Sequence, residues 1–512
     1  MIPLIGALFA TLAFLVVEPA HASTLVYSND VMGDIEPCGC RTNPLGGMAR
    51  KSGLLKTLKD PSILQLDAGD LLFGTVSLPD PLRKQAELQA GYVLKSADLI
   101  HQDAAVPGEK DFVLGVKTFD QLRKSAKIVF LAANLSRKNG KPFLKPYEIF
   151  LRKTTDGKNQ RIAVLGLVGS ELDWPKELKA SSPIARAKLE IPKLRKKADL
   201  IIALTHEGYD ADLALAKAVP DLDIIVGGHS QSFLQTPVKV GKTLVLQSSF
   251  RNQYVGILPL EKPIKSDEHR LVGLDAGYDP DALPEMNTLV IEFKKAVADL
   301  NIKETSLTQI PSTSHGENGK FQTFPHCAEC HLKQFDFWRK TNHALAFHAL
   351  VGKQQSKNQE CLSCHTVGLW DPQGFKDVTR LAEAKTGSGD KTDVVSTDDL
   401  DSFLKSMHDV KTLNDEVKIR QVDSKAVSLR NSLNRMVKSW TPVQCENCHQ
   451  PGLNHPFSSG YTKKVENTTC LKCHTPEQAP EWYRKSGEPD LEKITQKRAM
   501  VTCPAGELPP ED

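Results

Sequence analysis

The chain has 512 residues, of which 65 are Lys or Arg and 62 are Asp or Glu, so its formal net charge is only +3. This small charge gives no reason to expect a nucleic-acid partner, and the length exceeds what one hydrophobic core usually organises. We therefore expect at least two domains and no nucleic-acid binding.

The first 22 residues have the features of an export signal. Residues 1–17 are apolar, and Ala20 and Ala22 give the small-x-small pattern of a cleavage site. No later stretch approaches the length of a membrane span. Residues 1–22 are therefore predicted to be a signal peptide whose removal leaves a periplasmic protein with no membrane span. An uncleaved anchor is the alternative, because no Lys or Arg precedes the apolar run.

Residues 23–262 are predicted to form an α/β domain, because short apolar strands alternate with amphipathic helical stretches. The predicted helices are 81–96, opened by Asp80-Pro81, and a shorter one at 192–198 that begins with Pro192. The predicted strands are 24–27, 63–66, 128–131, 161–168, 199–204, 222–226 and 243–247.

Polar clusters follow several of these strands. They are Ser28-Asn29-Asp30, Asp67-Ala68-Gly69-Asp70, Leu204-Thr205-His206-Glu207-Gly208 and Gly227-Gly228-His229-Ser230-Gln231. Asp and His side chains that converge from strand ends onto Gly-rich turns are a common way to build a divalent metal site. The clusters therefore mark the candidate site of this domain.

In these clusters the chain resembles the calcineurin-like metallophosphoesterases, and specifically the 5′-nucleotidase branch, over residues 23–262. The resemblance implies a four-layer α/β metallophosphoesterase-like sandwich with two metal ions. It also implies that Asp30, Asp70, His206 and His229 are retained metal ligands. The C-terminal substrate-binding domain of that branch has no visible counterpart here.

The chain departs from the family motifs at several ligand positions. Met32 replaces a His, Glu109 and Lys110 replace an Asn and a His, and Gln231 replaces the last His. Glu109 can ligate a hard cation, whereas Met32 and Lys110 cannot replace imidazoles. Three readings stay open: a two-metal phosphoester hydrolase, a site for one divalent ion (Mn, Zn or Fe), and a metal-free scaffold in which the Lys110 ammonium neutralises the carboxylates.

Cys38 and Cys40 are separated by one Gly, shortly after Asp30. Two such thiols can form a strained, reducible disulfide or offer soft ligands, so they are redox candidates. A loop-stiffening disulfide without turnover is the alternative. Cys503 has no evident partner.

Residues 263–320 are predicted to connect two domains. Helical periodicity runs from Glu285 to Leu300, and a Ser/Thr/Gly-rich linker follows from Thr305 to Lys320.

Four copies of Cys-x-x-Cys-His occur in the last third of the chain. Two thiols at this spacing reach the two vinyl groups of one haem, and the adjacent His offers an imidazole to its iron. Structural zinc sites do not require a His after every second Cys. Four c-type haems are therefore expected, on Cys327, Cys330 and His331; on Cys361, Cys364 and His365; on Cys445, Cys448 and His449; and on Cys470, Cys473 and His474.

Around Trp338 to Ala344 and Cys445 to His455 the chain resembles the tetrahaem cytochrome c-554 family. The resemblance implies that residues 321–480 form a mainly α, haem-cored multihaem cytochrome c domain, before a polar tail at 481–512. It also implies that His343 and His455 are distal haem ligands, with His326, His348 and His408 as weaker candidates. The insert between the second and third motifs is expected to be partly helical at 400–407 and 427–437.

Three functions fit these features. The leading interpretation is a periplasmic electron-transfer protein, in which a tetrahaem cytochrome is fused to a nucleotidase-like domain with partly lost metal ligands. The second is a metal-dependent phosphoester hydrolase linked to haem redox state. The third is a haem oxidoreductase that acts on a small nitrogen or sulfur compound. Redox partner proteins and a small-molecule ligand or substrate are the expected partners.

Overall fold

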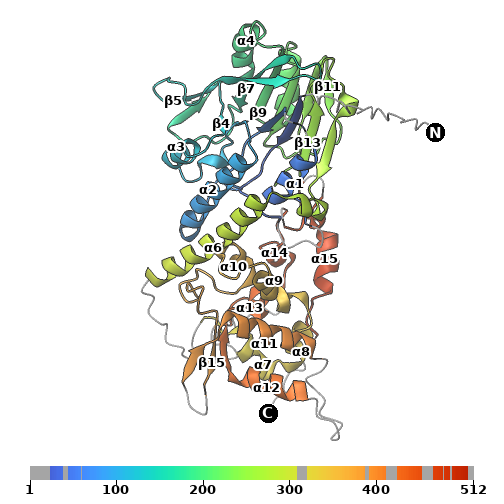
Figure 1. Cartoon of the computed structure of the whole chain (residues 1–512). Helices are drawn as coiled ribbons and strands as arrows, with labels where there is room; N and C mark the ends of the chain where they lie inside the picture. The colour runs from blue at the N-terminus through green and yellow to red at the C-terminus, as the bar shows by residue number, and fades with distance from the viewer. Residues whose placement is uncertain are drawn as a thin grey trace, which may run out of the picture. The chain divides into compact units, whose positions relative to one another are not determined.

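The computed structural model of the chain describes residues 23–37, 44–58, 60, 62–307, 320–386, 391–410, 424–452, 465–476, 478–484 and 487–504 (Figure 1). The predicted signal segment 1–22, the redox candidates Cys38 and Cys40, most of the predicted linker and His455 lie outside these residues. Among the described helices, none has the length and apolar character needed to cross a bilayer.

Two compact units share the chain, and their segments alternate along the sequence. Unit 1 contains the described residues up to Met32, then Leu54–Leu71 and Ile100–Gly273; unit 2 contains Gly33–Gly53, Leu72–Leu99 and the residues from Leu274 onward. The domain boundaries expected at residues 262, 320 and 480 stay predictions.

Unit 1 contains two six-stranded mixed sheets. The first has the order β14-β13-β1-β2-β3-β4, and the second has the order β11-β12-β10-β9-β7-β6. Strands β1 to β4 run parallel in the first sheet, as do β7, β9, β10 and β12 in the second. The bounds in the first sheet are β1 (Thr24–Ser28), β2 (Ile63–Asp67), β3 (Ala104–Ala105), β4 (Val129–Phe130), β13 (Tyr254–Pro259) and β14 (Arg270–Gly273). Those in the second are β6 (Tyr147–Lys153), β7 (Asn159–Val168), β9 (Leu200–His206), β10 (Ile224–Gly228), β11 (Val238–Val240) and β12 (Thr243–Leu246).

All seven predicted strands are confirmed, as β1, β2, β4, β7, β9, β10 and β12. The central strands β9 and β10 are buried along their whole lengths, as expected for parallel strands covered on both faces. Helices α4 (Pro183–Leu194) and α5 (Tyr209–Ala218) share one apolar cluster with β7, β9 and β10. Unit 1 also contains α3 (Val116–Lys124) and the antiparallel pair β5 (Leu135–Arg137) and β8 (Leu178–Ala180), while α1 (Met48–Leu58) spans both units.

The helix predicted at 192–198 is wrong. Helix α4 begins at Pro183, because the Ser182 side chain caps it by accepting a hydrogen bond from the backbone N–H of Ala185. Pro192 lies inside the last part of this helix, which ends at Leu194. Ser followed by Pro gives a stronger start signal than an isolated Pro.

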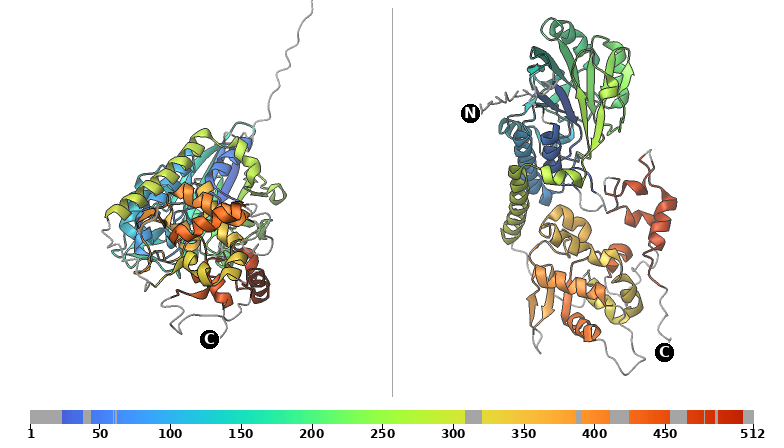
Figure 2. Two further views of the ribbon diagram at one scale, coloured as in Figure 1. Left: turned by 90° about the horizontal axis from the view of Figure 1, so that it is seen from below. Right: turned by 45° about the vertical axis from the view of Figure 1, so that its right-hand side comes forward.

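Unit 2 is mainly helical. Its longest helices are α2 (Arg83–Leu99) and α6 (Pro284–Leu307), which pack on each other and confirm the predicted helices at 81–96 and 285–300 (Figure 1). The shorter helices are α7 (Thr323–Cys330), α8 (Leu332–Trp338), α9 (Ala346–Gly352), α10 (Gln359–His365), α11 (Thr397–Asp409), α12 (Ser424–Arg435), α13 (Cys445–His449), α14 (Asn467–Cys470) and α15 (Leu491–Ala499) (Figure 2).

Helices α11 and α12 confirm helical structure in the insert, but the second helix ends at Arg435 rather than at Val437. The reason is that β17 (Met436–Ser439) pairs with β15 (Ala382–Lys385), which also pairs with β16 (Thr392–Val394). An apolar cluster that includes Phe324, Trp338 and Phe347 joins α7, α8 and α9 to α11.

The Asn134 side chain forms hydrogen bonds with three backbone groups of unit 1. Its side-chain amide donates to the carbonyls of Val168 and Ser181 and accepts from the N–H of Val168. Substituting Asn134→Ala removes these three hydrogen bonds, two of them to the buried backbone of Val168, so we expect the free energy of unfolding to fall by about 2–3 kcal/mol. Chemical denaturation measures this, with exposed Lys138→Ala as the control. Equal stability of the two variants would contradict the expectation.

Candidate functional site

The predicted metal ligands meet where the parallel strands of unit 1 end. Asp30 follows β1, Asp70 follows β2, and Glu109 lies in the loop after β3. His206 is the last residue of β9, and His229 directly follows β10. Since the carboxyl ends of parallel strands lie at one edge of a sheet, the two sheets present these five side chains to one another.

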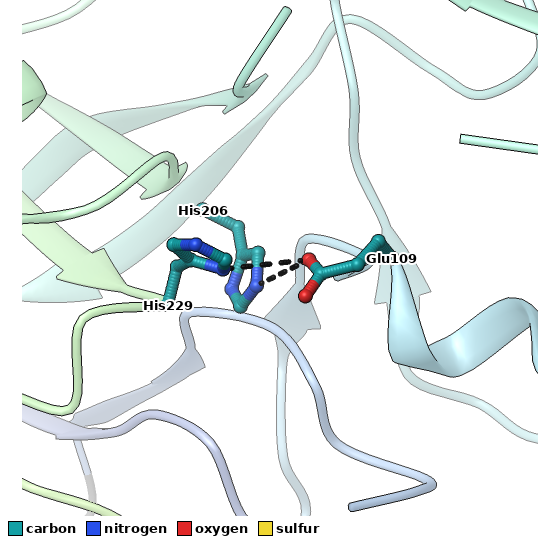
Figure 3. A group of neighbouring side chains, drawn as sticks. All are labelled: Glu109, His206 and His229. Atoms are coloured by element: carbon teal, nitrogen blue, oxygen red, sulfur yellow. Dashed lines mark ion pairs between the residues drawn. The ribbon is translucent and has the colours of Figure 1, made fainter. Parts of the chain in front are cut away.

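The donor atoms form two groups that share His206. Glu109, His206 and His229 form one group, and Asp30, Asp70 and His206 form the other, with the potential ligand atoms of each group within 4.8 Å of one another. Oε2 of Glu109 is 3.3 Å from Nε2 of His206 and 3.5 Å from Nδ1 of His229 (Figure 3). Oδ2 of Asp70 is 3.6 Å from Nε2 of His206.

The backbone at this site is held in a sparsely populated conformation. Asp30, Asp70 and His229 all have positive φ angles, of 50°, 51° and 76°. Gly108 has to be a glycine, since a Cβ there would lie 2.0 Å from Oδ1 of Asp70. At Gly69, where φ is +94°, a Cβ would lie 2.5 Å from Nδ1 of His206. Strain concentrated in ligand-bearing loops is typical of functional sites.

Neighbouring groups orient the ligand side chains. Nδ1 of His206 lies 2.7 Å from the carbonyl of Ala68, so an N–H at this position donates to it and directs Nε2 towards the carboxylates. Asn29 donates from its amide to Oδ2 of Asp30 at 2.8 Å, and its own oxygen accepts from Ser248. Asn29 and Ala68 belong to the polar clusters of the sequence, but only the fold gives them these roles.

Lys110 places an ammonium inside the same site. Its Nζ lies 2.5 Å from Oδ2 of Asp70, and its backbone N–H donates to Oδ1 of that carboxylate at 3.1 Å. The Lys110 side chain is 16% exposed, whereas that of Asp70 is fully buried. The Lys110 ammonium therefore neutralises the Asp70 carboxylate.

Burial and charge pairing shift the pKa values of the site. Burial raises the pKa of Asp30 to about 6. Burial acts to lower the pKa of His206, but Asp70 and Glu109 outweigh it and raise the pKa to about 10. For Glu109, burial acts to raise the pKa, but the facing His206 and His229 imidazoles hold it well below its usual range. Burial also opposes the charge of Lys110, yet Asp70 raises its pKa.

The donor set fits one divalent cation. Four buried atoms of the site have no hydrogen-bond partner: Oδ1 of Asp30, Oε2 of Glu109, Nε2 of His206 and Nδ1 of His229. Carboxylate oxygens and imidazole nitrogens are suitable ligands for Mn²⁺, Zn²⁺ or Fe²⁺. A cation bound by this set would displace the proton of His206 and satisfy the orphaned atoms.

The remaining family positions do not join either group of donor atoms. Met32 is buried with a φ of 58°, and Gln231 has a φ of 54°. Neither side chain supplies an imidazole, so the Asp30 side of the site has fewer nitrogen ligands than the resemblance implies.

The four Cys-x-x-Cys-His motifs of unit 2 are built on short helical turns. Helix α7 carries Cys327 and Cys330 and is followed by His331, whereas α10 and α13 contain their whole motifs. Helix α14 ends at Cys470, and the N–H of His474 donates to the Cys470 carbonyl at 3.0 Å. All eight motif cysteines have unbridged thiols, as thioether formation to haem requires.

The motifs lie in two pairs. The Cys445 thiol of the third motif hydrogen-bonds to the Cys327 thiol of the first. Sγ of Cys473 in the fourth motif is 3.9 Å from the carbonyl oxygen of Cys364 in the second. Motifs that are far apart in sequence are thus brought together within unit 2.

His343 lies among the motif histidines. Its ring centroid is 6.2 Å from that of His474, in an edge-on arrangement, and burial followed by the charges of His474 and His365 lowers its pKa. A buried neutral imidazole is suited to iron ligation, as the resemblance implies for His343. Of the weaker candidates, His348 pairs through Nδ1 with Asp401 at 2.9 Å, while His326 and His408 face Glu329 and Asp409.

Comparisons with known proteins match the two parts of the chain separately. Residues 326–386 match the family model of cytochrome c554 and c-prime. Snake venom 5′-nucleotidase from Gloydius brevicauda is 27% identical over 255 residues, which are 46% of this chain and 41% of that protein. The 5′-nucleotidase of Vibrio cholerae is 30% identical over 263 residues, which are 44% of each.

A solved structure of the sulfate thiohydrolase SoxB from Thermus thermophilus aligns with a TM-score of 0.47 at 18% identity, covering 55% of this chain and 62% of that chain. The chain thus spans less than half the length of the curated relatives. Its first part is similar to 5′-nucleotidases and has the expected α/β fold. Its second part has a helical region of the cytochrome c554 type.

Replacing Lys110 tests the charge balance of the site. In Lys110→Met, Asp70 loses the ammonium, so we expect the metal-free protein to be less stable by about 3 kcal/mol. Added Mn²⁺ should then stabilise the variant more than the unaltered protein, because the cation takes over the role of the ammonium. Thermal unfolding with and without Mn²⁺ measures this, with the exposed Lys117→Met as the control. Equal stabilisation of the variant and the unaltered protein by Mn²⁺ would contradict the neutralising role.

Asp212, which lies behind the site, gives a pH-dependent expectation. Burial raises its pKa from 3.8 to about 7. A carboxyl with a raised folded-state pKa stabilises fully below its unfolded pKa, and this contribution is lost as the pH rises towards 7. Asp212→Asn should therefore flatten the fall in stability between pH 4 and 7, by up to about 4 kcal/mol. Urea unfolding across this range measures the change, and the exposed Asp210→Asn should keep the original slope. An unchanged slope in Asp212→Asn would mean that this carboxyl does not titrate there.

Proposed function

We propose that the chain is a periplasmic electron-transfer protein, in which four c-type haems are attached to unit 2 and one divalent cation occupies the phosphoesterase-like site of unit 1. The four Cys-x-x-Cys-His motifs support the electron-transfer function, together with the match to the cytochrome c554 family. The contact between Lys110 and Asp70 supports the loss of two-metal hydrolysis.

In the haem-binding part, each motif would attach one haem through two thioethers and offer one His to its iron. The haems supply one-electron redox chemistry when they are bound. The protein's part is to orient the ligands: Nδ1 of His365 lies 2.6 Å from the Ala346 carbonyl, so an N–H there donates to it and directs Nε2 away from that carbonyl.

Glu446 fixes the first and third motifs relative to each other. This buried side chain of the third motif accepts hydrogen bonds from the backbone N–H groups of Gln322, Thr323 and Gly452. The first two N–H groups lie at the start of α7, which carries the first motif. A fixed spacing between motifs favours electron exchange between their haems.

At the phosphoesterase-like site, Glu109, His206 and His229 would hold the cation. The cation would supply electrostatic attraction for an anionic ligand. Lys110 occupies one oxygen of Asp70, so this carboxylate has less capacity to hold a second cation. Met32 and Gln231 supply no imidazole, which further weakens the binding of a second metal ion.

A metal-dependent phosphoester hydrolase linked to haem redox state is the second candidate. The intact Glu109, His206 and His229 group favours it, and so does the similarity to 5′-nucleotidases. One metal ion and an ammonium could still bind a phosphate ester, although the family's general acid position is occupied by Lys110.

Metal analysis of the purified holoprotein distinguishes these functions. We expect haem iron from all four motifs, about one equivalent of non-haem Mn, Zn or Fe, and no phosphodiesterase turnover. In Glu109→Ala the non-haem metal should be lost while the haem iron is retained. The exposed Glu177→Ala should keep both. Two equivalents of non-haem metal with phosphodiesterase turnover would overturn the proposal in favour of the hydrolase.

A further inference from the structure

Four buried amide side chains meet where α2, α6 and α10 come together in unit 2. They are Gln85 of α2, Asn301 of α6, Asn358 just before α10, and Gln359 at its first position, and each is at most 7% exposed. Helix α10 carries the second haem-binding motif, whereas α2 belongs to the part of the sequence that resembles 5′-nucleotidases. Neither the motif nor the family resemblance accounts for this cluster.

Gln85 is the centre of the cluster. Its Nε2 donates to Oδ1 of Asn358 at 2.7 Å, and its Oε1 accepts from Nδ2 of Asn301 at 2.8 Å and from the N–H of Gln359 at 3.3 Å. Asn301 also donates to the carbonyl of Lys357 at 2.8 Å. A buried amide with several partners in fixed directions defines orientation more narrowly than apolar packing does.

The partner of Gln85 is also the cap of the haem-binding helix. Oδ1 of Asn358 accepts from the N–H of Glu360 at 2.9 Å and so caps the start of α10. Beyond the end of α10, Nε1 of Trp370 donates back to Oε1 of Gln359 at 2.9 Å. Helix α10 has only seven residues, so its direction depends on these contacts rather than on its own length.

A second set of polar contacts continues the same junction. Glu36 pairs with Lys294 of α6 at 2.7 Å and accepts from Nε2 of Gln355 at 3.2 Å. Nε2 of Gln89, one turn beyond Gln85 on α2, donates to the carbonyl of Gly33 at 2.8 Å. The chain segment that follows Met32 is thereby attached to both helices.

We propose that α2 and α6 form the packing surface for helix α10, which carries the second haem-binding motif. Gln85 fixes the position of α10 on this surface. The proposal rests on the proposed function only in that the second motif carries a haem. Helix α2, from the part of the sequence that resembles 5′-nucleotidases, would then be a structural component of the second haem site.

The test uses holoprotein with Gln85→Met, a substitution that keeps side-chain length and removes all three hydrogen bonds. Reductive titration followed in the visible spectrum, with electron paramagnetic resonance of the oxidised haems, should show that one of the four haems changes its potential and its low-spin signal while three are unaltered. A His365→Met variant identifies the second haem, since exchange of an axial His for Met raises its potential. The exposed Glu87→Met on the same helix should leave all four haems as they are.

Four unaltered haems in folded Gln85→Met would overturn the proposal. So would a change in a haem other than the second. Peptide mass analysis shows separately whether the second motif carries haem, so a failure of haem attachment is recognised as a failure of the proposed function.

Hydrogen exchange of the unaltered holoprotein tests, without any substitution, whether the amide cluster holds the start of α10. The N–H groups of Gln359 and Glu360 should exchange as slowly as the buried centre of α2, because they open only when the cluster opens. Exchange at these positions at least tenfold faster than in α2 would overturn the proposal even if Gln85→Met does not yield holoprotein.

Discussion

Charge compensation inside a buried site is the constraint on which unit 1 depends. Three carboxylates and two imidazoles are brought out of water at the strand ends, and a net negative charge there would be costly. The structure balances it with an ammonium on Asp70 and with the His206 imidazole, whose pKa Asp70 and Glu109 raise. A metal ion competes with both. The Lys110 ammonium interacts with Asp70, Asp30 and Glu109, so it affects the electrostatics of the whole site.

The two groups of donor atoms in this site differ in how their charges are compensated. Around Glu109, His206 and His229 the donor atoms face each other without protein partners, whereas Asp70 is already paired and Asp30 is fixed by Asn29. Retained strand ends and strained loops show that the scaffold still delivers its ligands to one place. Lys110 contributes one fixed positive charge at that place.

Patterns of neighbouring residues predicted those elements whose formation depends on residues close together in the sequence. The strands of unit 1 are continuous apolar runs, and polar residues directly after them identified Asp30, Asp70, His206 and His229. Helix α4 was misplaced because Pro192 imitates a start that Ser182 provides. The pairing of β15 with β17 and the contacts of Gln85 link positions 52 or more residues apart. Single polar residues such as Asn301 carry no signal of a partner elsewhere in the chain. The Nε2 orientation of His206 likewise depends on a carbonyl 138 residues away.

The alternation of the two units along the sequence has a consequence for biogenesis. Gly33–Gly53 and Leu72–Leu99 belong to unit 2 but are synthesised long before the haem-binding motifs. The polar face of α2 that carries Gln85 is therefore synthesised 216 and 273 residues before its partners Asn301 and Asn358. Contacts of such long sequence separation form late and slowly in folding. Unit 2 thus cannot complete its packing around Gln85 until the chain as far as α10 has been made, although α2 is among its first helices.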